Sequence, residues 1–465
     1  MSFPAYPAYK DSGVEWLGVV PGHWSVKPLR YLGRFRKGLT ITKADLTDTG
    51  IPCLNYGEVH SLYPFEVNQD IQALKCVPAE YLETEPSSSI KYGDFVFADT
   101  SEDLEGVGNF THVSGLEPLF AGYHTIIYSL DSDVSSRFLA YCVESFAFRT
   151  QLRMGVKGVK VFSVTQEILR GGLAWLPTPA EQTQIARFLD HETARIDALI
   201  EEQQRLIELL KEKRQAVISH SVTKGLDPTV PMKDSGVEWL GEVPAHWGTN
   251  ALNKLTVKIT NGYVGPTRDI LVESGVPYVQ ATHIKRGVVN FDDAYFVTPE
   301  WSMRMSKSIL QEGDVLIVQT GAGTGDVGVV SSKEVGYNCH ALIILQTEKK
   351  IISGVFLGQV LQSRFGQSVL YSIRTGGMHP HLNCGEVKFV KIPVPPLREQ
   401  EEISNFVKTF SEKTEKLIID AGTTMDLLQE RRSALISAAV TGKIDVRGWQ
   451  PPASAPTPEL AQEAV

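Results

Sequence analysis

One glycine-rich stretch has the residue spacing of a cofactor-binding loop. Gly323, Gly325 and Gly328 fit the pattern G-x-G-x-x-G directly after an apolar segment. A dinucleotide or methyl donor bound there would also need a helix after the loop, because the helix N-terminus meets the phosphate. The residues that follow, VVSSKEVGY, have the composition of another strand. The sequence therefore favours a hairpin turn at this place, and we expect no cofactor in this chain.

Other patterns that carry catalysis or bind metals are missing or poorly formed. The sequence has no G-K-[ST] phosphate loop, no G-x-S-x-G nucleophile elbow and no D/N-P-P-Y/F motif of the kind that amino-methyltransferases use. His379, His381 and Cys384 have irregular spacing for a zinc site. We predict no metal and no catalytic residues, which indicates a binding scaffold rather than an enzyme.

Polar and basic loop residues are the better candidates for function. Amides, hydroxyls and carboxylates read base edges, whereas Lys and Arg on flexible loops hold phosphates. Each residue taken alone is equally well explained as part of a solvated turn, but the set occurs in two matching places and favours nucleic acid. The candidates for DNA contact are Asn55, Tyr56, Thr100, Ser101, Glu102, Asp103, Arg153, Lys157, Lys160, Gln280, Thr282, Gln319, Thr320, Thr324, Arg374, Thr375 and His379.

The two places match because the chain contains one unit written twice. KDSGVEWLGVVPGHW at 10–24 returns as KDSGVEWLGEVPAHW at 233–247, and YGDFVFADTSEDLEGVG at 92–108 matches EGDVLIVQTGAGTGDVG at 312–328. A period of this length indicates a tandem duplication rather than a solenoid. Each tag, as we call 10–24 and 233–247, is predicted to form a short helical turn. Its tryptophans would give it an aromatic face, for which plain packing is the simpler explanation.

Two long helical stretches, 181–227 and 399–445, align without a gap at a constant offset of 218. Thr178, Pro179 and Glu181 form a strong helix start before the first of them. Apolar residues at heptad spacing predict that the two helices pack along their length as an antiparallel intramolecular coiled coil. The predicted seam residues are Ile185, Leu189, Ile196, Leu199, Leu206, Leu210, Val217, Ile403, Val407, Phe410, Leu417, Leu428 and Leu435.

The residues between tag and helix in each copy read as short strands between turns, with some helical segments. Apolar runs at 95–97 and 315–318 follow Gly-Asp turns and predict strands. The expected fold class is α+β, with two mixed heads in tandem separated by the long helices. The predicted boundaries are 1–176 for the first head, 177–227 for the central spacer helix, 228–394 for the second head, 395–445 for the C-terminal spacer helix and 446–465 for a disordered tail.

Composition limits the class of protein. The 465 residues exceed the ~250–300 at which a single core stops growing, so more than one domain is expected. The net charge of −9 argues against a simple DNA-coating protein, but much of it lies in the two helical stretches. The five scattered cysteines suit reduced thiols. With neither a signal peptide nor an apolar run of membrane-spanning length, we expect a cytoplasmic protein without a membrane partner.

These motifs together resemble one known family. The twin tags DSGVEWLG-x-VP-x-HW, the GDF/GDV strand-turn and the VTQEIL…LPTPAEQ stretch at 164–182 resemble the specificity subunit of type I restriction-modification systems. The likeness extends to about Asp445. It implies two target-recognition domains, each reading one half of a bipartite double-stranded DNA site, and spacer helices that pair antiparallel.

The resemblance also implies partners. Two methylation subunits, and then two restriction subunits, would bind this non-catalytic chain, and S-adenosylmethionine would be the cofactor of the methylation subunits. The difference between ADTSEDLEG and VQTGAGTGD suggests that the two heads read different half-sites. Two alternatives remain at this point: a stand-alone DNA methyltransferase or nuclease, and a coiled-coil assembly protein indifferent to DNA.

Overall fold

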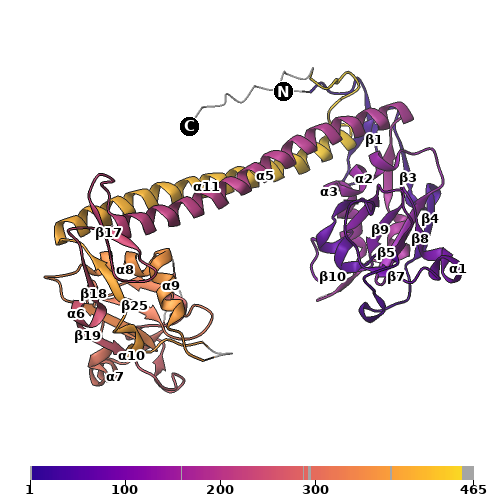
Figure 1. The fold of residues 1–465 in the computed structure, drawn as a ribbon. Coiled ribbons are helices and arrows are strands. Elements are labelled where there is room, and N and C mark those ends of the chain that lie inside the picture. The colour runs from indigo at the N-terminus through magenta and orange to yellow at the C-terminus, as the bar shows by residue number, and fades with distance from the viewer. Residues whose placement is uncertain (1–2, 159, 286, 292–294, 377–379, 453–465) are drawn as a thin grey trace. The chain divides into compact units, whose positions relative to one another are not determined.

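The computed structural model describes residues 3–158, 160–285, 287–291, 295–376 and 380–452 (Figure 1). The chain divides into two compact units, Met1–Glu202 with Thr424–Val465, and Gln203–Thr423, which we call the first and the second unit. Each unit contains one mixed α+β head and a part of each of two long helices, α5 and α11. Among the described residues no helix combines the length and apolar character of a membrane span.

The first head is built on a five-stranded sheet with the strand order β4-β13-β9-β11-β6. Its strands are β4 (Gly33–Lys37), β6 (Phe65–Val67), β9 (Phe95–Ala98), β11 (Phe110–Val113) and β13 (Thr125–Leu130). A second sheet contains β5 (Ile51–Leu54), β7 (Cys76–Val77), β8 (Ser89–Ile90) and β12 (Leu119–Ala121). The helices are α1 (Tyr81–Thr84), α2 (Ser136–Glu144), α3 (Phe146–Gly155) and α4 (Gln166–Gly171). Phe95 on β9 and Phe138 on α2 lie in the same buried cluster, so this helix packs on the sheet.

The second head repeats this plan. Its larger sheet has the order β19-β28-β25-β26-β23-β22. These strands are β19 (Thr256–Asn261), β22 (Ile284–Lys285), β23 (Gly287–Val289), β25 (Val315–Val318), β26 (Val327–Val329) and β28 (Leu342–Thr347). The smaller sheet contains β20 (Leu271–Val272), β21 (Val276–Val279), β24 (Phe296–Val297) and β27 (Asn338–Cys339). The helices are α6 (Leu252–Leu255), α7 (Pro299–Arg304), α8 (Gly354–Gln362), α9 (Arg364–Ser372) and α10 (Cys384–Val387).

Each tag is a β-hairpin whose loop contains the predicted short helical turn, since the N–H of Gly18 donates to the carbonyl of Val14 at 3.0 Å and that of Gly241 donates to the carbonyl of Val237 at 3.3 Å. In the first tag β1 (Tyr9–Asp11) pairs with β2 (Val19–Pro21), and in the second β16 (Met232–Asp234) pairs with β17 (Glu242–Pro244). Ser12 does not cap a helix, because its hydroxyl oxygen accepts from the N–H of Val14, only two residues on, at 3.1 Å. Tag and long helix are then joined by short sheets, β3 (Ser25–Pro28) with β15 (Leu173–Leu176) and β18 (Gly248–Ala251) with β29 (Lys391–Val394).

The long helices begin at equivalent positions but end differently. Helix α5 spans Pro179–Lys224 (46 residues) and α11 spans Leu397–Val440 (44 residues). At the end of the helical stretch the first copy has Lys224-Gly225 and the second has Gly442-Lys443. In the alignment of the two copies, the glycine that follows α11 therefore comes one residue earlier than the glycine that follows α5. Both glycines have positive φ, 81° and 72°. A glycine in the left-handed conformation is a common helix stop, which explains the earlier end of α11.

The seam between the helices differs in part from the predicted residues. Ile185, Leu189, Ile196, Ile403 and Val407 are buried, and Leu210, Val217, Phe410, Leu428 and Leu435 are half-buried. Leu199, Leu206 and Leu417, however, are 43%, 42% and 53% exposed. Ile200, Ile207 and Ile418, each one residue further on, are the less exposed neighbours. The heptad phase was predicted one residue too early there, because two adjacent apolar residues fit the spacing equally well.

The two helices pack antiparallel within each unit. In the first unit Arg432 Nε lies 2.8 Å from Asp197 Oδ1, and in the second Arg214 Nη1 lies 2.7 Å from Glu415 Oε2. From Asp197 to Arg214 the residue number rises along α5, and from Arg432 to Glu415 it falls by the same amount along α11. One antiparallel register accounts for both ion pairs. The α+β fold with two long helices pairing as an antiparallel coiled coil is confirmed; the residue boundaries of the functional domains stay a prediction.

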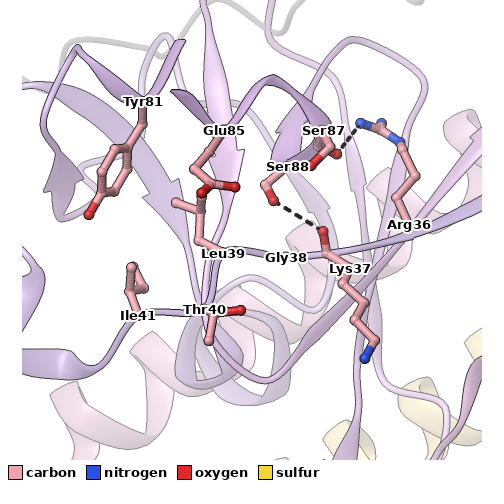
Figure 2. A pocket seen from close by; sticks show the side chains of 10 residues that line it. All are labelled: Arg36, Lys37, Gly38, Leu39, Thr40, Ile41, Tyr81, Glu85, Ser87 and Ser88. Atoms are coloured by element: carbon pink, nitrogen blue, oxygen red, sulfur yellow. Dashed lines mark hydrogen bonds between the residues drawn. The ribbon is translucent and has the colours of Figure 1, made fainter. Parts of the chain in front are cut away.

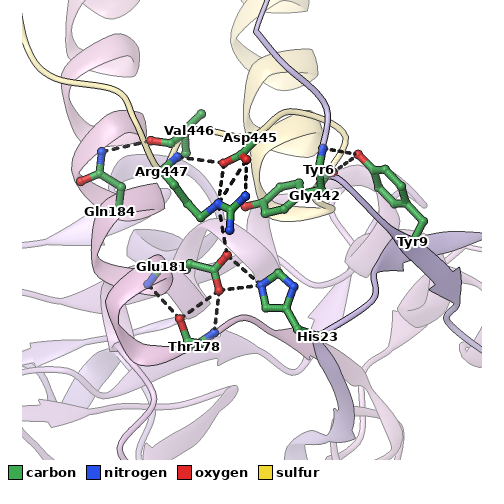
Figure 3. A network of polar contacts seen from close by, with 10 residues as sticks. All are labelled: Tyr6, Tyr9, His23, Thr178, Glu181, Gln184, Gly442, Asp445, Val446 and Arg447. Carbon is green, nitrogen blue, oxygen red and sulfur yellow. Dashed lines mark hydrogen bonds and ion pairs between the residues drawn. The ribbon is translucent and has the colours of Figure 1, made fainter.

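The Glu-Gln pair at the start of each helix ties it to the head. Glu181 closes the capping box with Thr178, whose hydroxyl donates to Glu181 Oε2 at 2.9 Å, and also lies 2.8 Å from His23 Nε2 of the tag (Figure 3). Glu399 lies 2.8 Å from His246 Nε2 in the same way. Gln182 and Gln400 accept from the N–H groups of Ser135 and Ser353 at 2.9 and 2.8 Å, just before α2 and α8. The recurring His and Glu-Gln motifs therefore have a structural explanation.

The end of α11 packs against the first tag, as the end of α5 packs against the second. A Cβ at Gly442 would meet Pro21 at 2.4 Å and Trp24 at 3.3 Å, and one at Gly225 would meet Trp247 at 3.3 Å. The N–H of Asp445 donates to the carbonyl of Pro4 at 2.8 Å. The segment predicted to be a disordered tail begins with packed residues, since Val446 is fully buried and Trp449 contacts the core of the first unit. Residues 453–465 lie outside the described part.

Buried His112 in the first head should make the free energy of unfolding depend on pH. Burial, and next Arg137, lower the pKa of His112 from 6.5 to about 4. Between these values the unfolded chain binds a proton that the folded chain does not, so stability should fall as pH drops from 6.5 to 4. The loss should be roughly 3 kcal/mol. We expect His112→Gln to reduce this dependence, measured as the difference in urea unfolding between pH 7 and pH 4.5. An equal pH dependence in variant and parent would contradict the assignment.

Candidate nucleic-acid interface

Four loops meet in the first head at the ends of β5 and β9 and before β13. The N–H of Asp99 donates to the carbonyl of His124 at 3.1 Å, and the carbonyl of Asp99 accepts from Val164 N–H at 2.8 Å. The N–H of Tyr56 donates to the carbonyl of Tyr123 at 3.3 Å. In addition, β10 (Thr100–Ser101) pairs with β14 (Phe162–Ser163). These bonds join segments far apart in the sequence into one loop cluster, the first loop cluster.

The second head holds an equivalent set of loops, the second loop cluster. The carbonyl of Gln319 accepts from Leu382 N–H at 3.0 Å, and bridges join His381 to both Thr320 and Thr375. Tyr263 accepts from Ala341 N–H at 2.9 Å through its carbonyl. The Gln319–Leu382 bond and the Thr320–His381 bridge match the Asp99–Val164 bond and the Thr100–Ser163 pairing of the first head, so this part of the two clusters has the same backbone frame with different side chains on it.

One residue in each cluster has an unusual backbone. His124 and Ala341 have φ values of 54° and 41°, and each directly precedes the equivalent strand, β13 or β28. The left-handed region costs energy for residues other than glycine and tends to occur at functional sites. His124 Nδ1 also lies 3.2 Å from Asp99 Oδ1. Sequence patterns do not reveal this position, because it becomes visible only when the strand start and its φ angle are known.

The candidate DNA-contact residues are distributed over both clusters and differ in exposure. The exposed ones are Glu102, Asp103, Lys157, Lys160, Thr282, Thr320 and Thr375. The half-buried ones are Tyr56, Thr100, Arg153, Gln280, Gln319 and Arg374. The buried ones are Asn55, Ser101 and Thr324. His379 lies outside the described residues.

The buried candidates hold the loops rather than face solvent. The side-chain amide of Asn55 donates to the carbonyl of Cys53 at 3.2 Å. The hydroxyl of Ser101 donates to the carbonyl of Asp103 at 2.7 Å, and that of Thr324 donates to the carbonyl of Gly321 at 2.6 Å. Because these polar groups already have partners within the loops, the exposed and half-buried members of the set stay the candidates for DNA contact.

Two arginines occupy matching positions near the ends of α3 and α9. Arg153 Nη2 donates to the carbonyl of Glu105 at 2.9 Å, and Arg374 Nη2 donates to the carbonyl of Thr324. Burial, and next Arg149, lower the pKa of Arg153. In both heads a guanidinium thus fixes the loop after the central strand β9 or β25. Nε of both guanidinium groups is buried, so a phosphate could be met only by the remaining Nη N–H groups.

The two clusters differ in charge. Asp99, Glu102 and Asp103 surround Tyr56, whose pKa burial raises and these carboxylates raise further. The second cluster has Gln319, Gly321 and Thr320 in the corresponding loop. A carboxylate accepts a hydrogen bond from cytosine, whereas an amide pairs with adenine. The clusters are therefore suited to different base patterns.

A cavity of about 440 Å³ lies beside the first cluster, lined in part by Lys37, Thr40 and Tyr81 (Figure 2). Arg36 at its wall donates to the carbonyls of Ser87 and Ser89 at 2.6 and 2.8 Å, so its charge is used within the protein. Lys37 is exposed at the end of β4. It is a phosphate-contact candidate that sequence reasoning missed. Within the described residues no group of three metal-ligating side chains occurs.

Comparison with known proteins agrees with this architecture. The family model for the type I restriction modification DNA specificity domain matches residues 252–421. The chain is 24% identical over 327 residues to the EcoBI specificity subunit of Escherichia coli, covering 68% of this chain and 67% of that one. It is also 24% identical over 438 residues to the putative MjaX specificity subunit of Methanocaldococcus jannaschii, covering 93% and 96%.

Solved structures share the fold. A chain from a structure described as the basis of complex assembly and conformational transition of the type I R-M system matches with a TM-score of 0.68 and 16% identity. That match covers 91% of this chain and 99% of the other. The HsdS subunit from Thermoanaerobacter tengcongensis matches with a TM-score of 0.50 and 16% identity, covering 91% and 98%.

Tandem α+β heads and paired long helices are thus the fold that this chain shares with solved type I R-M structures. Residues 252–421 match the type I restriction modification DNA specificity domain, and the chain is similar over most of its length to type I restriction enzyme specificity subunits.

Proposed function

We propose that this chain reads a bipartite, asymmetric DNA site for a type I restriction-modification complex, with one half-site read by each loop cluster. The observation that carries the proposal is the pair of clusters, which share one backbone frame but differ in their side chains and charge. A duplicated frame suits a repeated task, and different polar groups on it suit different sequences.

The chain's own residues bind and position. Exposed Lys157 and Lys160 would contact phosphates, and the salt dependence of binding would report such contacts. Glu102, Asp103, Gln319 and Thr320 would read base edges. We assign to the complex two methylation subunits, which would use S-adenosylmethionine and flip the target adenine, and two restriction subunits. The paired helices would set the distance between the half-sites.

Exchange of a head is the direct test. Replacing residues 28–175 with the corresponding head of another specificity subunit should change one half of the methylated motif and leave the other half unchanged. The measurement is a map of methylated adenines in DNA from cells that carry this chain with its methylation subunits. A motif altered in both halves, or in neither, would contradict reading by separate heads. Methylation or cleavage by the purified chain alone would favour a stand-alone enzyme instead.

The residue His124 offers a finer test of the same site. We expect His124→Ala to change the base preference at one position of the half-site read by the first head, or to weaken methylation there by about 5–150-fold, the range for one good base contact. The matched change Ala341→Gly, which relieves the left-handed backbone without removing a polar group, should keep the second half-site. A normal motif at full efficiency with His124→Ala would argue against a reading role for this residue.

A further inference from the structure

The two tags share residues that the fold does not require. Residues 10–18 and 233–241 are identical, KDSGVEWLG, although the loops after β9 and β25 have diverged to ADTSEDLEG and VQTGAGTGD. Identity retained between two otherwise diverged copies needs a cause that acts on both. For each identical residue, the structure shows whether contacts within the chain explain why both copies keep it.

Several identities follow from the hairpin itself. Leu17 and Leu240 are buried, with 8% and 5% exposure. Asp11 Oδ1 accepts from Gly13 N–H at 2.8 Å, and Asp234 Oδ1 accepts from Gly236 N–H at 3.0 Å. Gly13, Gly18, Gly236 and Gly241 have positive φ. Core packing and turn geometry thus account for the Asp, Gly and Leu positions.

Three positions remain that these contacts do not explain, Lys10 with Lys233, Glu15 with Glu238, and Trp16 with Trp239, and the last two pairs are the more informative. Trp16 and Trp239 are 40% and 50% exposed, although the other tryptophan of each tag, Trp24 or Trp247, is fully buried. Glu15 and Glu238 are exposed, and neither forms a hydrogen bond or ion pair within the described part of the chain. An exposed tryptophan beside an unpaired carboxylate, present twice, indicates a contact with something outside the chain.

The chemistry of the patch favours a protein over DNA. Lys10, Asp11 and Glu15 give the exposed tag one net negative charge, which repels phosphate. Tryptophan is among the residues that most often anchor protein interfaces, where its ring enters an apolar pocket. A suitable partner therefore has an apolar pocket next to a cationic side chain. Because the patch occurs once per unit with the same residues, two copies of the same partner would fit.

We propose that each tag docks one copy of a single protein partner, through Glu15 and Trp16 in the first unit and through Glu238 and Trp239 in the second. This inference rests on the proposed function, in which two methylation subunits and then two restriction subunits join the chain; we assign the tags to the methylation subunits because these bind the chain first. It assigns part of the docking of these subunits to the tags, whereas DNA reading stays with the loop clusters.

The test counts the methylation subunits bound to each chain. The full chain is co-purified with them, and native mass spectrometry gives the stoichiometry while titration gives the affinity. Trp16→Ala and Trp239→Ala should each weaken one of the two binding events by about 30-fold or more, as for an anchor residue, and the double variant should weaken both. The charge reversals Glu15→Arg and Glu238→Arg provide a second route to the same loss.

A control variant separates this result from general effects of surface change. Leu116→Ala removes another exposed apolar side chain, 82% exposed in the first head, and should leave two subunits bound. If the double tryptophan variant holds two subunits at unchanged affinity, the docking inference is overturned while the proposed function stands. If it holds both subunits but loses DNA affinity, the tags contact DNA and the inference is again overturned. If the parent chain binds no methylation subunit, the proposed function itself fails.

Discussion

Ending the chain after Ile444 should lower the free energy of unfolding of the first unit by about 3 kcal/mol or more, from the burial of apolar side chains alone. The truncation removes Val446, which is fully buried, and Trp449, whose ring lies 5.3 Å from Phe188 and 5.2 Å from His191. It also removes the acceptors for Gln184, whose amide donates to the carbonyls of Val446 and Trp449 at 3.1 and 2.6 Å (Figure 3).

The expected loss of stability is large because the residues after α11 hold the end of this helix against the first unit. Helix α5 continues covalently into the second tag, whereas α11 meets the first tag only through noncovalent contacts. Beyond α11, Arg447 adds contacts to the start of α5 and to the segment before the first tag, since it lies 3.9 Å from Glu181 and 4.9 Å from the ring centre of Tyr6. Its guanidinium also holds the pKa of Asp445 below the usual value. At the position equivalent to Arg447, the second unit has Thr229, whose hydroxyl donates to Asp227 Oδ1 at 2.7 Å.

Urea unfolding of the truncated and complete chains measures the difference. A chain ending after Pro452 is the matched control, because it keeps every contact described above, and its stability should equal that of the complete chain. The second unit serves as an internal reference whose transition should not move. Equal stability of the chains ending at 444 and at 452 would show that the residues after α11 contribute little.

Much of the architecture could be predicted because the duplication supplies each pattern twice. The strands that became β9 and β25, the start of α5 at Thr178 and Pro179, and the antiparallel pairing all follow from local residue patterns. Only part of each tag could be predicted in the same way. Ser12 and Glu15 have capping-box spacing, but pairing of β1 with β2 dominates and produces a hairpin.

The candidate site was less predictable for physical reasons. Asn55 and Ser101 have the chemistry of base-reading residues, yet burial uses their polar groups inside the loops. His124 lacks any motif, and its prominence comes from a backbone conformation that tertiary contacts impose. Polarity and loop position therefore locate the right segments of the chain. Which side chain of a segment faces outward is decided by packing, and a single sequence does not contain that information.

Lengthening both paired helices should change the length of the recognised DNA site. Seven residues inserted between Glu202 and Gln203 in α5, with seven inserted between Asp426 and Leu427 in α11, should lengthen the unread DNA between the half-sites by about three base pairs. These positions are matched in the antiparallel register that both ion pairs share. Seven residues add ~10.5 Å to a helix and preserve the heptad phase, and B-DNA rises ~3.4 Å per base pair.

Insertion into α5 alone provides the contrast. It shifts one helix against the other, so the pairs Asp197–Arg432 and Arg214–Glu415 cannot both form in one register. We expect that variant to lose methylation rather than to move it. The matched double insertion should retain both half-site sequences, because no residue of either loop cluster is altered. The methylation map distinguishes the outcomes: an unchanged spacer with normal efficiency in the double insertion would mean that the helices do not set the distance. A longer spacer between unchanged half-sites would show that the helices set the distance, because the double insertion changes only the helix length.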